Sequence, residues 1–427
     1  MSWMMMSVEG PLLSAVIARL PDARLNLAAY GGIVSPIRSL IMSPVMMLLS
    51  ASTALCRDWA TYRKLYRFMM LLSAGLTVLV ALVAYTPLFF FVAEDLLGAP
   101  PELHQLARWG LMISVPVGWG VAYRRFHQGI LIRNGFSNAI MGGTVIRISG
   151  YAGILLLGYL IGTLPGTVVE AIALVIGIWG EAIYTGLRVR PVLRYQVKPA
   201  PPAEPLTWRS FFAFYIPLVF TSLFNMIWSP ISSASMARMP RPIDSLAVMP
   251  VINGLTFLFR SFGLALNEVV VSLLDRPRAV QMLRRFVLYV AISTTALFML
   301  MVLTPLSGLW FEKVSALSPP LALLAQTAIL LAIPLPAVGA LRSWSQGALL
   351  FGRKTRGISE AIVVSLVTLV IVLWAGVSWG RVAGAYVGVA GLMIANLTQT
   401  LWLWLRSRPL IASLAARPEE SAPQAAG

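Results

Sequence analysis

The chain contains an internal repeat whose two copies lie in segments that are almost entirely apolar. Early positions of the two copies match at a spacing of 219 residues, and later positions match at a spacing of 218. The matches are Pro11, Ser14, Ala15, Ala18, Arg19 and Pro21 with Pro230, Ser233, Ala234, Ala237, Arg238 and Pro240, then Arg67, Thr86, Pro116, Arg124 and Gln128 with Arg285, Thr304, Pro334, Arg342 and Gln346. Because duplicated halves are typical of membrane transporters, the repeat predicts two equivalent membrane-embedded halves.

The composition excludes a soluble globular protein. The 427 residues are 58% hydrophobic and 11% charged, whereas soluble domains carry about 25% charged residues. The net charge of +17 is spread over loops, so we expect a lipid bilayer and no nucleic acid as its partner. The single cysteine, Cys56, excludes an internal disulfide, and His104 and His127 lie in separate segments. We therefore expect no metal site, no cofactor and no enzyme activity.

The hydropathy pattern predicts an all-α polytopic membrane protein with twelve spans of about 20 residues or more. We expect the spans near 1–20, 27–55, 66–92, 104–131, 136–161, 166–187, 208–237, 243–272, 282–305, 317–347, 357–378 and 383–405. They divide the chain into an N-terminal six-helix bundle (1–187), a proline-rich linker (188–207), a C-terminal six-helix bundle (208–405) and a disordered tail (406–427).

Basic residues predict how these spans are oriented. One set of alternate loops holds 21 Lys and Arg residues and the opposite set holds six. Because loops rich in Lys and Arg face the cytoplasm, this bias places the basic loops, the linker and both termini there. We expect the protein to lie in the inner (cytoplasmic) membrane of the cell. Six spans in each half give both halves the same orientation, so the repeat is parallel and its axis runs along the membrane normal.

The start of the first span is displaced relative to its repeat. The seventh span begins near Trp208, whose equivalent at a spacing of 219 would lie at position −11, before the first residue of the sequence. We therefore expect the first helix to be truncated at Met1, with its true start upstream. A first span that is naturally short is the alternative.

Four ionisable side chains lie near the middle of predicted spans: Glu9, Arg38, Arg147 and Arg260. A charge at that depth costs roughly 2.5–3.5 kcal/mol, so each is a candidate functional residue facing the protein interior. Three of them do not repeat, because the equivalent positions at a spacing of 219 hold Trp228 for Glu9, Phe257 for Arg38 and Ile41 for Arg260.

Glu9 and Glu268 are the candidates for coupling to a cation, which is H⁺ or Na⁺. A carboxylate within a span can bind and release a cation during transport. The alternative for Glu9 is a structural ion pair with Arg38 on the neighbouring span. Arg260 and Glu268 are just over two helical turns apart, about 12 Å, which favours two separate contacts over a direct pair.

The candidates for substrate binding are Arg38, Arg147, Asn225, Arg260 and Asn267. Arg38 lies between two prolines, and spans interrupted in this way often line a cavity where an arginine could hold an anionic group. The alternatives are an internal ion pair for Arg38, contacts to carbonyl oxygens for Arg147, and helix-to-helix hydrogen bonding for Asn225.

Some repeated polar residues are more simply explained as scaffold. Arg124 and its equivalent Arg342 lie at the predicted cytoplasmic ends of spans, where basic residues set topology. Gln128 and Gln346 are each followed by glycine and are expected to permit close helix packing.

Two parallel six-helix halves joined by a basic linker resemble the multidrug/oligosaccharidyl-lipid/polysaccharide (MOP) flippase superfamily, which includes the MATE exporters. Within it, the segment LAAYG at 27–31, Arg38 followed by Pro44, and HQGIL at 127–131 are similar to segments of the progressive ankylosis (ANK) transporters. The resemblance implies a V-shaped pair of bundles around a central cavity that opens to each side in turn. It also implies ion-driven export in which an acidic residue of the first span, here Glu9, couples to the cation.

Our leading hypothesis is a monomeric secondary active exporter of a small organic solute or drug. The midplane arginines favour an anionic substrate. The alternative is a flippase for a polyprenyl-linked saccharide or another lipid-linked precursor, which would use the same fold with a lateral opening to the bilayer.

Overall fold

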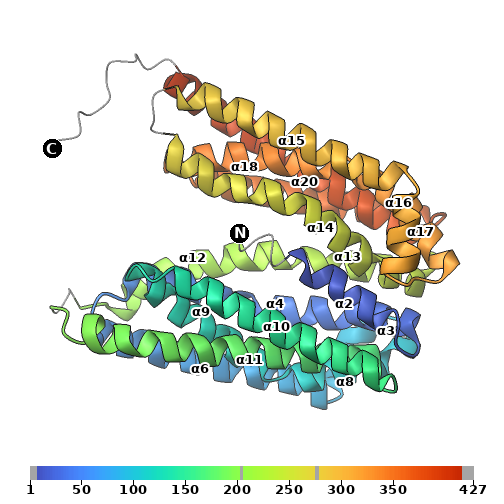
Figure 1. Ribbon diagram of the computed structural model, residues 1–427, viewed down its shortest axis with the longest axis horizontal. Coiled ribbons are helices and arrows are strands. Elements are labelled where there is room, and N and C mark those ends of the chain that lie inside the picture. The colour runs from blue at the N-terminus through green and yellow to red at the C-terminus, as the bar shows by residue number, and fades with distance from the viewer. Residues whose placement is uncertain (1–6, 202–204, 275–277, 416–427) are drawn as a thin grey trace.

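The computed structural model describes residues 7–201, 205–274 and 278–415, and every regular element in these ranges is helical (Figure 1). The elements of the N-terminal half (N-half) are α2 (Glu9–Ile17), α3 (Ala23–Ala29), η1 (Tyr30–Val34), α4 (Ser35–Met46), α5 (Leu48–Leu55), α6 (Trp59–Tyr85), α7 (Leu88–Phe90), η2 (Phe91–Leu96), η3 (Pro101–Leu103), α8 (His104–Ser114), α9 (Val117–Arg133), α10 (Asn138–Ile161), α11 (Gly166–Val192) and η4 (Leu193–Val197). Those of the C-terminal half (C-half) are α12 (Trp208–Met226), α13 (Trp228–Ala237), α14 (Pro242–Leu273), α15 (Ala279–Leu303), α16 (Leu306–Gly308), η5 (Leu309–Val314), α17 (Pro319–Ile329), η6 (Leu330–Ala332), α18 (Leu335–Phe351), α19 (Arg356–Trp379) and α20 (Gly384–Ala415).

The helices repeat with the spacing found in the sequence, which confirms two parallel halves. Helices α9, α10 and α11 begin 218 residues before α18, α19 and α20, respectively. Helices α10 and α19 also end 218 residues apart, and each is followed by a glycine in the left-handed region, Gly162 and Gly380. Repeated positions can therefore be compared between the halves residue by residue.

A π-helical turn explains why the spacing falls from 219 to 218. The second span of the N-half, Ala23–Leu55, has 33 residues and includes the π-helical turn η1, whereas its equivalent α14 has 32. A π-turn accommodates one extra residue within a helix. Because η1 precedes Arg38, the equivalent of Arg38 is Thr256 and that of Arg260 is Met42. The pairing of Arg38 with Phe257 and of Arg260 with Ile41 was therefore wrong by one residue, although neither charge repeats in the corrected alignment.

Among the described residues, ten helical segments are long and apolar enough to cross a membrane. The other two predicted spans are the first one, of which α2 is described, and the α8–α9 segment, which turns at Val115–Pro116 and carries adjacent arginines in α9. The predicted truncation concerns residues 1–6 and their upstream side, outside the described residues. Helical structure continues to Val197, beyond the expected start of the linker, and α20 continues to Ala415, into the expected tail.

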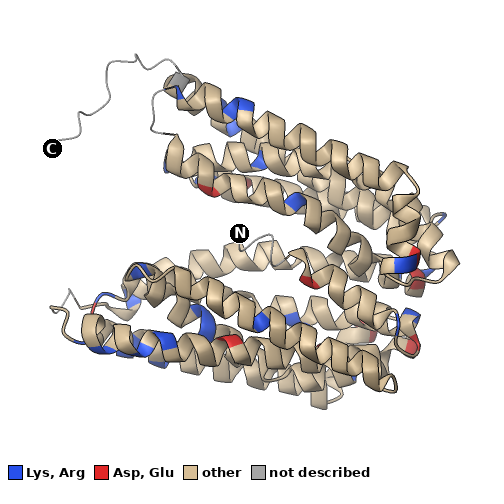
Figure 2. Cartoon of the chain, in the orientation of Figure 1, with Lys and Arg blue, Asp and Glu red and all other residues tan. Residues whose placement is uncertain are grey.

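The two bundles form a V (Figure 1). They approach one another around α3, α13 and η5, which we call the closed end, and diverge toward the other end, the open end. Lysines and arginines gather at the open end, which holds the loops predicted to be cytoplasmic (Figure 2). In the V, helices α2 and α3 pack on α14, and α12 packs on α4 of the opposite half.

The first helices of each half form the contact between the halves. On the N-half side, α4 accepts two hydrogen bonds at 2.8 Å, from Tyr215 Oη to the Pro44 carbonyl and from Ser222 Oγ to the Ser43 carbonyl. Near the closed end, a Cβ at Gly31 would lie 2.2 Å from Pro250 Cγ. Only glycine allows η1 to approach α14 this closely.

Two equivalent arginines bind the halves together at the closed end, and we call these contacts the arginine clasps. Arg19, after α2, donates to the carbonyls of Lys313 at 2.5 Å and Val314 at 2.7 Å in η5. Arg238, after α13, donates to the carbonyls of Asp95 and Leu96 at 3.1 Å in η2. Arg19 contacts the end of η5 and Arg238 contacts the end of η2, which is the equivalent π-turn in the other half. The two clasps are therefore related by the repeat.

Cys56 offers a direct check of the packing at the open end. The side chain is 1% exposed between α5 and α6, and burial raises the pKa of its thiol to about 12. Because the thiolate is the reactive form, we expect negligible maleimide labelling of the folded protein at pH 7–8 and complete labelling in denaturant. Labelling followed by mass spectrometry tests this, and rapid modification of the folded protein would contradict the packing.

Candidate functional site

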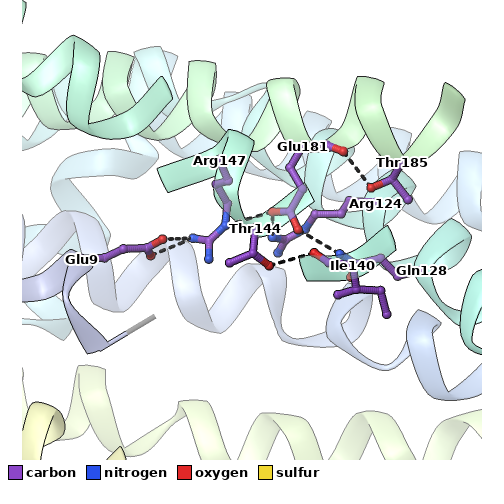
Figure 3. Close-up of polar contacts among 8 residues, drawn as sticks. All are labelled: Glu9, Arg124, Gln128, Ile140, Thr144, Arg147, Glu181 and Thr185. Atoms are coloured by element: carbon purple, nitrogen blue, oxygen red, sulfur yellow. Dashed lines mark hydrogen bonds and ion pairs between the residues drawn. The ribbon is translucent and has the colours of Figure 1, made fainter. Parts of the chain in front are cut away.

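Charged side chains from four N-half helices form a continuous network (Figure 3). Arg147 of α10 contacts Glu9 of α2 at 2.5 Å and Glu181 of α11 at 2.9 Å. Glu181 also accepts hydrogen bonds from Arg124 and, at 2.9 Å, from Gln128 Nε2, both in α9. We call Glu9, Arg124, Gln128, Arg147 and Glu181 the N-half network. It contains two arginines and two carboxylates, so its formal charges balance.

The network runs from a partly exposed end to a buried one. The side chain of Glu9 is 23% exposed, that of Arg147 is 10% exposed, and that of Glu181 is 1% exposed. Glu181 is buried because α11 packs closely on both α9 and α10. A buried carboxylate is tolerated in such a place when several donors satisfy it. Arg147 therefore connects the partly exposed carboxylate of Glu9 with the buried carboxylate of Glu181.

Arg38 forms a separate ion pair. Its guanidinium lies 3.1 Å from Glu170 Oε1 of α11, and the Glu170 side chain is 1% exposed. The suggested pairing of Glu9 with Arg38 is therefore not formed, since Glu9 pairs with Arg147 and Arg38 with Glu170. The internal ion pair that was the alternative for Arg38 is the arrangement observed.

A second polar site lies inside the C-half, in a cavity of about 150 Å³ that we call the arginine cavity. Arg260 Nη2 and Arg342 Nη1 donate to the same Asn396 Oδ1, at 3.1 and 3.0 Å, and Arg342 also donates to Gln399 Oε1 at 3.2 Å. No Asp or Glu is among the described residues that line this cavity. The predicted residue Asn225 lines it too.

A larger cavity of about 280 Å³ lies between the halves, and we call it the central cavity. Small polar side chains, such as Ser14, Ser232 and Asn253, line it together with aromatic Tyr30 and Trp228. Trp228 borders both this cavity and the arginine cavity. The two spaces therefore adjoin at one side chain.

The remaining predicted residues lie elsewhere. Asn267 of α14 is close to Gly347 of α18, and its Oδ1 is buried without a hydrogen-bond partner among the described residues. Glu268 is exposed on α14 and lines neither cavity. The structure thus brings Glu9 and Arg147 together in one site and Arg260 and Asn225 in another. Arg38 stands apart from both, and so do Asn267 and Glu268.

Four important residues were missed or interpreted differently in the sequence. Glu170 and Glu181 are carboxylates inside the predicted span 166–187, so the cost of a buried charge should have marked both. Arg124 and Arg342 were interpreted as topology signals, but Arg124 is buried, Arg342 is partly buried, and their guanidiniums face α11 and α20. Nowhere in the described part of the chain do three His, Cys, Asp or Glu side chains form a group that could hold a metal ion.

The chain has the fold of known transporters. An inward-facing MATE family multidrug resistance transporter of the MOP superfamily is similar over 97% of this chain and 96% of that one, with 14% identity and a TM-score of 0.74. An outward-facing MATE structure gives 0.62 at 16% identity, covering 98% and 95%. The lipid II flippase MurJ, in an inward closed conformation, gives 0.61 at 14% identity, covering 96% and 90%.

These similarities confirm the predicted MATE-like fold of a multi-pass membrane protein. No protein-family model matches the sequence, and no curated protein is significantly similar to it. The narrower similarity to the ANK transporters stays a prediction. Because the same fold is known in inward- and outward-facing forms, it is suited to alternating access.

Proposed function

We propose that the protein is a secondary active transporter that exports a small organic solute or drug by cation-coupled alternating access. We further propose that it acts as a monomer in the cytoplasmic membrane with both termini in the cytoplasm. The observation that carries the proposal is the contact between Arg147 of α10 and Glu9 of α2, a helix that lines the central cavity between the halves. Helix α2 touches α10 and α11 of its own half and α14 of the other, so a change at Glu9 acts on both.

The coupling step follows from charge balance in the N-half network. When Glu9 takes up a proton, Arg147 loses one of its two anionic partners and is held by Glu181 alone. The attraction between α2 and α10 then weakens, which allows α2 to move with the C-half. A ligand or ion shifts such an equilibrium only by its different affinity for the two states, and the charge on Arg147 provides that difference.

We expect Glu9→Gln to abolish coupling, because glutamine keeps the shape of the side chain and cannot exchange a proton. The measurement is uptake of labelled organic anions and cationic dyes into liposomes, with proton and sodium gradients imposed separately. Wild-type uptake should follow one gradient, and the variant should show no response to it. Glu102→Gln, an exposed carboxylate of η3, is the matched control. Gradient-driven uptake by Glu9→Gln would overturn the coupling role.

The alternative is a flippase for a polyprenyl-linked saccharide or another lipid-linked precursor. The similarity of the fold to the lipid II flippase MurJ is the observation in its favour. The liposome experiment separates the two proposals, since movement that ignores both gradients and requires a lipid-linked substrate would favour the flippase.

A further inference from the structure

The arginine cavity of the C-half occupies the position that the N-half network occupies in its own half. The repeat relates four pairs of residues in these two places. The equivalent pairs are Arg124 with Arg342, Glu181 with Gln399, Arg147 with Ser365, and Glu9 with Trp228. Arg342, Gln399, Ser365 and Trp228 all line the arginine cavity. Only the first arginine is common to both halves.

The differences change the charge and the space of the site. In the N-half, Arg124 contacts the carboxylate of Glu181, and in the C-half Arg342 contacts the neutral amide of Gln399. Arg147 fills the N-half position with a long side chain, whereas Ser365 is short and bonds to the Ile362 carbonyl of its own helix at 2.8 Å. The N-half therefore contains its own counter-ions, and the C-half has a cavity there.

Arg260 adds a second cation that has no equivalent in the N-half, where Met42 takes its place. Its Nε is buried and has no hydrogen-bond partner in the described part of the chain. Asn396 supplies one oxygen to both guanidiniums, while its amide nitrogen donates to the Leu392 carbonyl at 2.8 Å. A neutral amide oxygen is a weaker partner for two arginines than a carboxylate or phosphate oxygen would be.

We infer that the arginine cavity binds an oxyanion group, a carboxylate or a phosphate, of the transported molecule. This inference rests on the proposed transport function and names its substrate class. The cavity of about 150 Å³ leaves room for one such group beside the two guanidiniums. The organic part of the molecule would extend past Trp228 into the central cavity.

The test measures binding to the purified full-length protein by isothermal titration calorimetry, with phenyl phosphate and benzoate as probes and benzyl alcohol as the neutral comparison. We expect wild type to bind at least one of the two anions and to bind benzyl alcohol more weakly. Glu at position 399 would supply the missing counter-ion, so Gln399→Glu should weaken anion binding about ten-fold or more, as should Arg260→Gln.

Matched controls remove effects of net charge and folding. Gln281→Glu and Arg284→Gln make the same substitutions at exposed positions of α15 and should bind as wild type does. Size-exclusion chromatography identifies variants that have not folded. One cavity variant adds a negative charge and the other removes a positive charge, so the inference can still be tested if one of them misfolds. Equal binding of anions by wild type and both cavity variants would overturn the inference, as would a wild type that binds neither anion.

The oxyanion could belong to a free solute or to a lipid headgroup. Nanodiscs of phosphatidylcholine alone and nanodiscs with added phosphatidic acid separate these sources. Competition between phosphatidic acid and phenyl phosphate in the wild type would assign the site to a lipid phosphate. Phenyl phosphate binding that phosphatidic acid does not affect would assign it to a free solute.

Failure of the binding experiment can be told apart from failure of the transport proposal. Binding of the probes needs no gradient, so it is measured independently of transport. Anion binding without gradient-driven uptake of any organic anion would leave the site intact and overturn the transport mechanism.

Discussion

Glu181→Gln is expected to lower the free energy of unfolding by about 3–5 kcal/mol, the cost of leaving buried charges without their partner. Glu181 is 1% exposed and is the carboxylate partner of both Arg124 and Arg147. Glutamine would retain one acceptor oxygen but would leave two cations to Glu9 alone. The measurement is unfolding in mixed micelles, with the apparent melting temperature as a second readout.

The C-half supplies a rescue for this variant. There the equivalent glutamine, Gln399, is accommodated beside Arg342 because Ser365 stands where the N-half has Arg147. Arg147→Ser combined with Glu181→Gln reproduces that pattern and should recover a large part of the lost stability. If the double variant is less stable than Glu181→Gln alone, the comparison between the halves does not describe the energetics of the network.

The sequence predicted the fold well because its strongest signals are local or repeated. Apolar stretches define spans without knowledge of their neighbours, and the 218-residue spacing reappears in the helix boundaries. The one-residue change of spacing was visible in the sequence, but its location was not. The spacing alone could not place the π-turn at Tyr30–Val34, so the positions equivalent to Arg38 and Arg260 were misassigned.

The site was predicted less well because ion pairs depend on the rotation of each helix. The cost of a buried charge drew attention to Glu9 and Arg147, which the structure brings into one network. It could not show which arginine faces which carboxylate, since residues 138 positions apart in sequence meet only in the packed bundle. Arg342 illustrates the opposite case. Its repetition suggested a scaffold residue, but its partner is the neutral Gln399, whereas the equivalent residue in the N-half is the charged Glu181.

Replacing both arginines of the clasps is expected to shift the protein toward a state that opens at the closed end. Arg19 and Arg238 are exposed, so each clasp should contribute only about 1 kcal/mol, but both hold the same interface. Losing the two together changes the ratio of states about ten-fold or more. When Ser232→Cys, in the central cavity, is combined with Arg19→Gln/Arg238→Gln, a reagent from the closed end should label it about ten-fold faster or more.

The measurement is the rate at which a membrane-impermeant maleimide, added on the side of the closed end, labels Ser232→Cys. The native Cys56 provides a low background because it is buried at the opposite end. Arg381→Gln removes an exposed charge near the closed end and is the matched control. Unchanged labelling in the double clasp variant would show that other contacts, such as that of Gly31 with Pro250, hold this end together.

The single variants should then differ in effect, because only one clasp belongs to the helix that carries Glu9, the carboxylate proposed to couple transport to a cation. Glu9 and Arg19 lie at opposite ends of α2, about 15 Å apart along the helix, whereas Arg238 follows α13, where Trp228 replaces Glu9. Arg19→Gln should therefore change the labelling rate of Ser232→Cys. It should also change the effect that Glu9→Gln has on this rate. Arg238→Gln should change the labelling rate by a similar factor, and its effect should be additive with that of Glu9→Gln. Independent addition for both arginines would mean that α2 does not connect the network to the clasp.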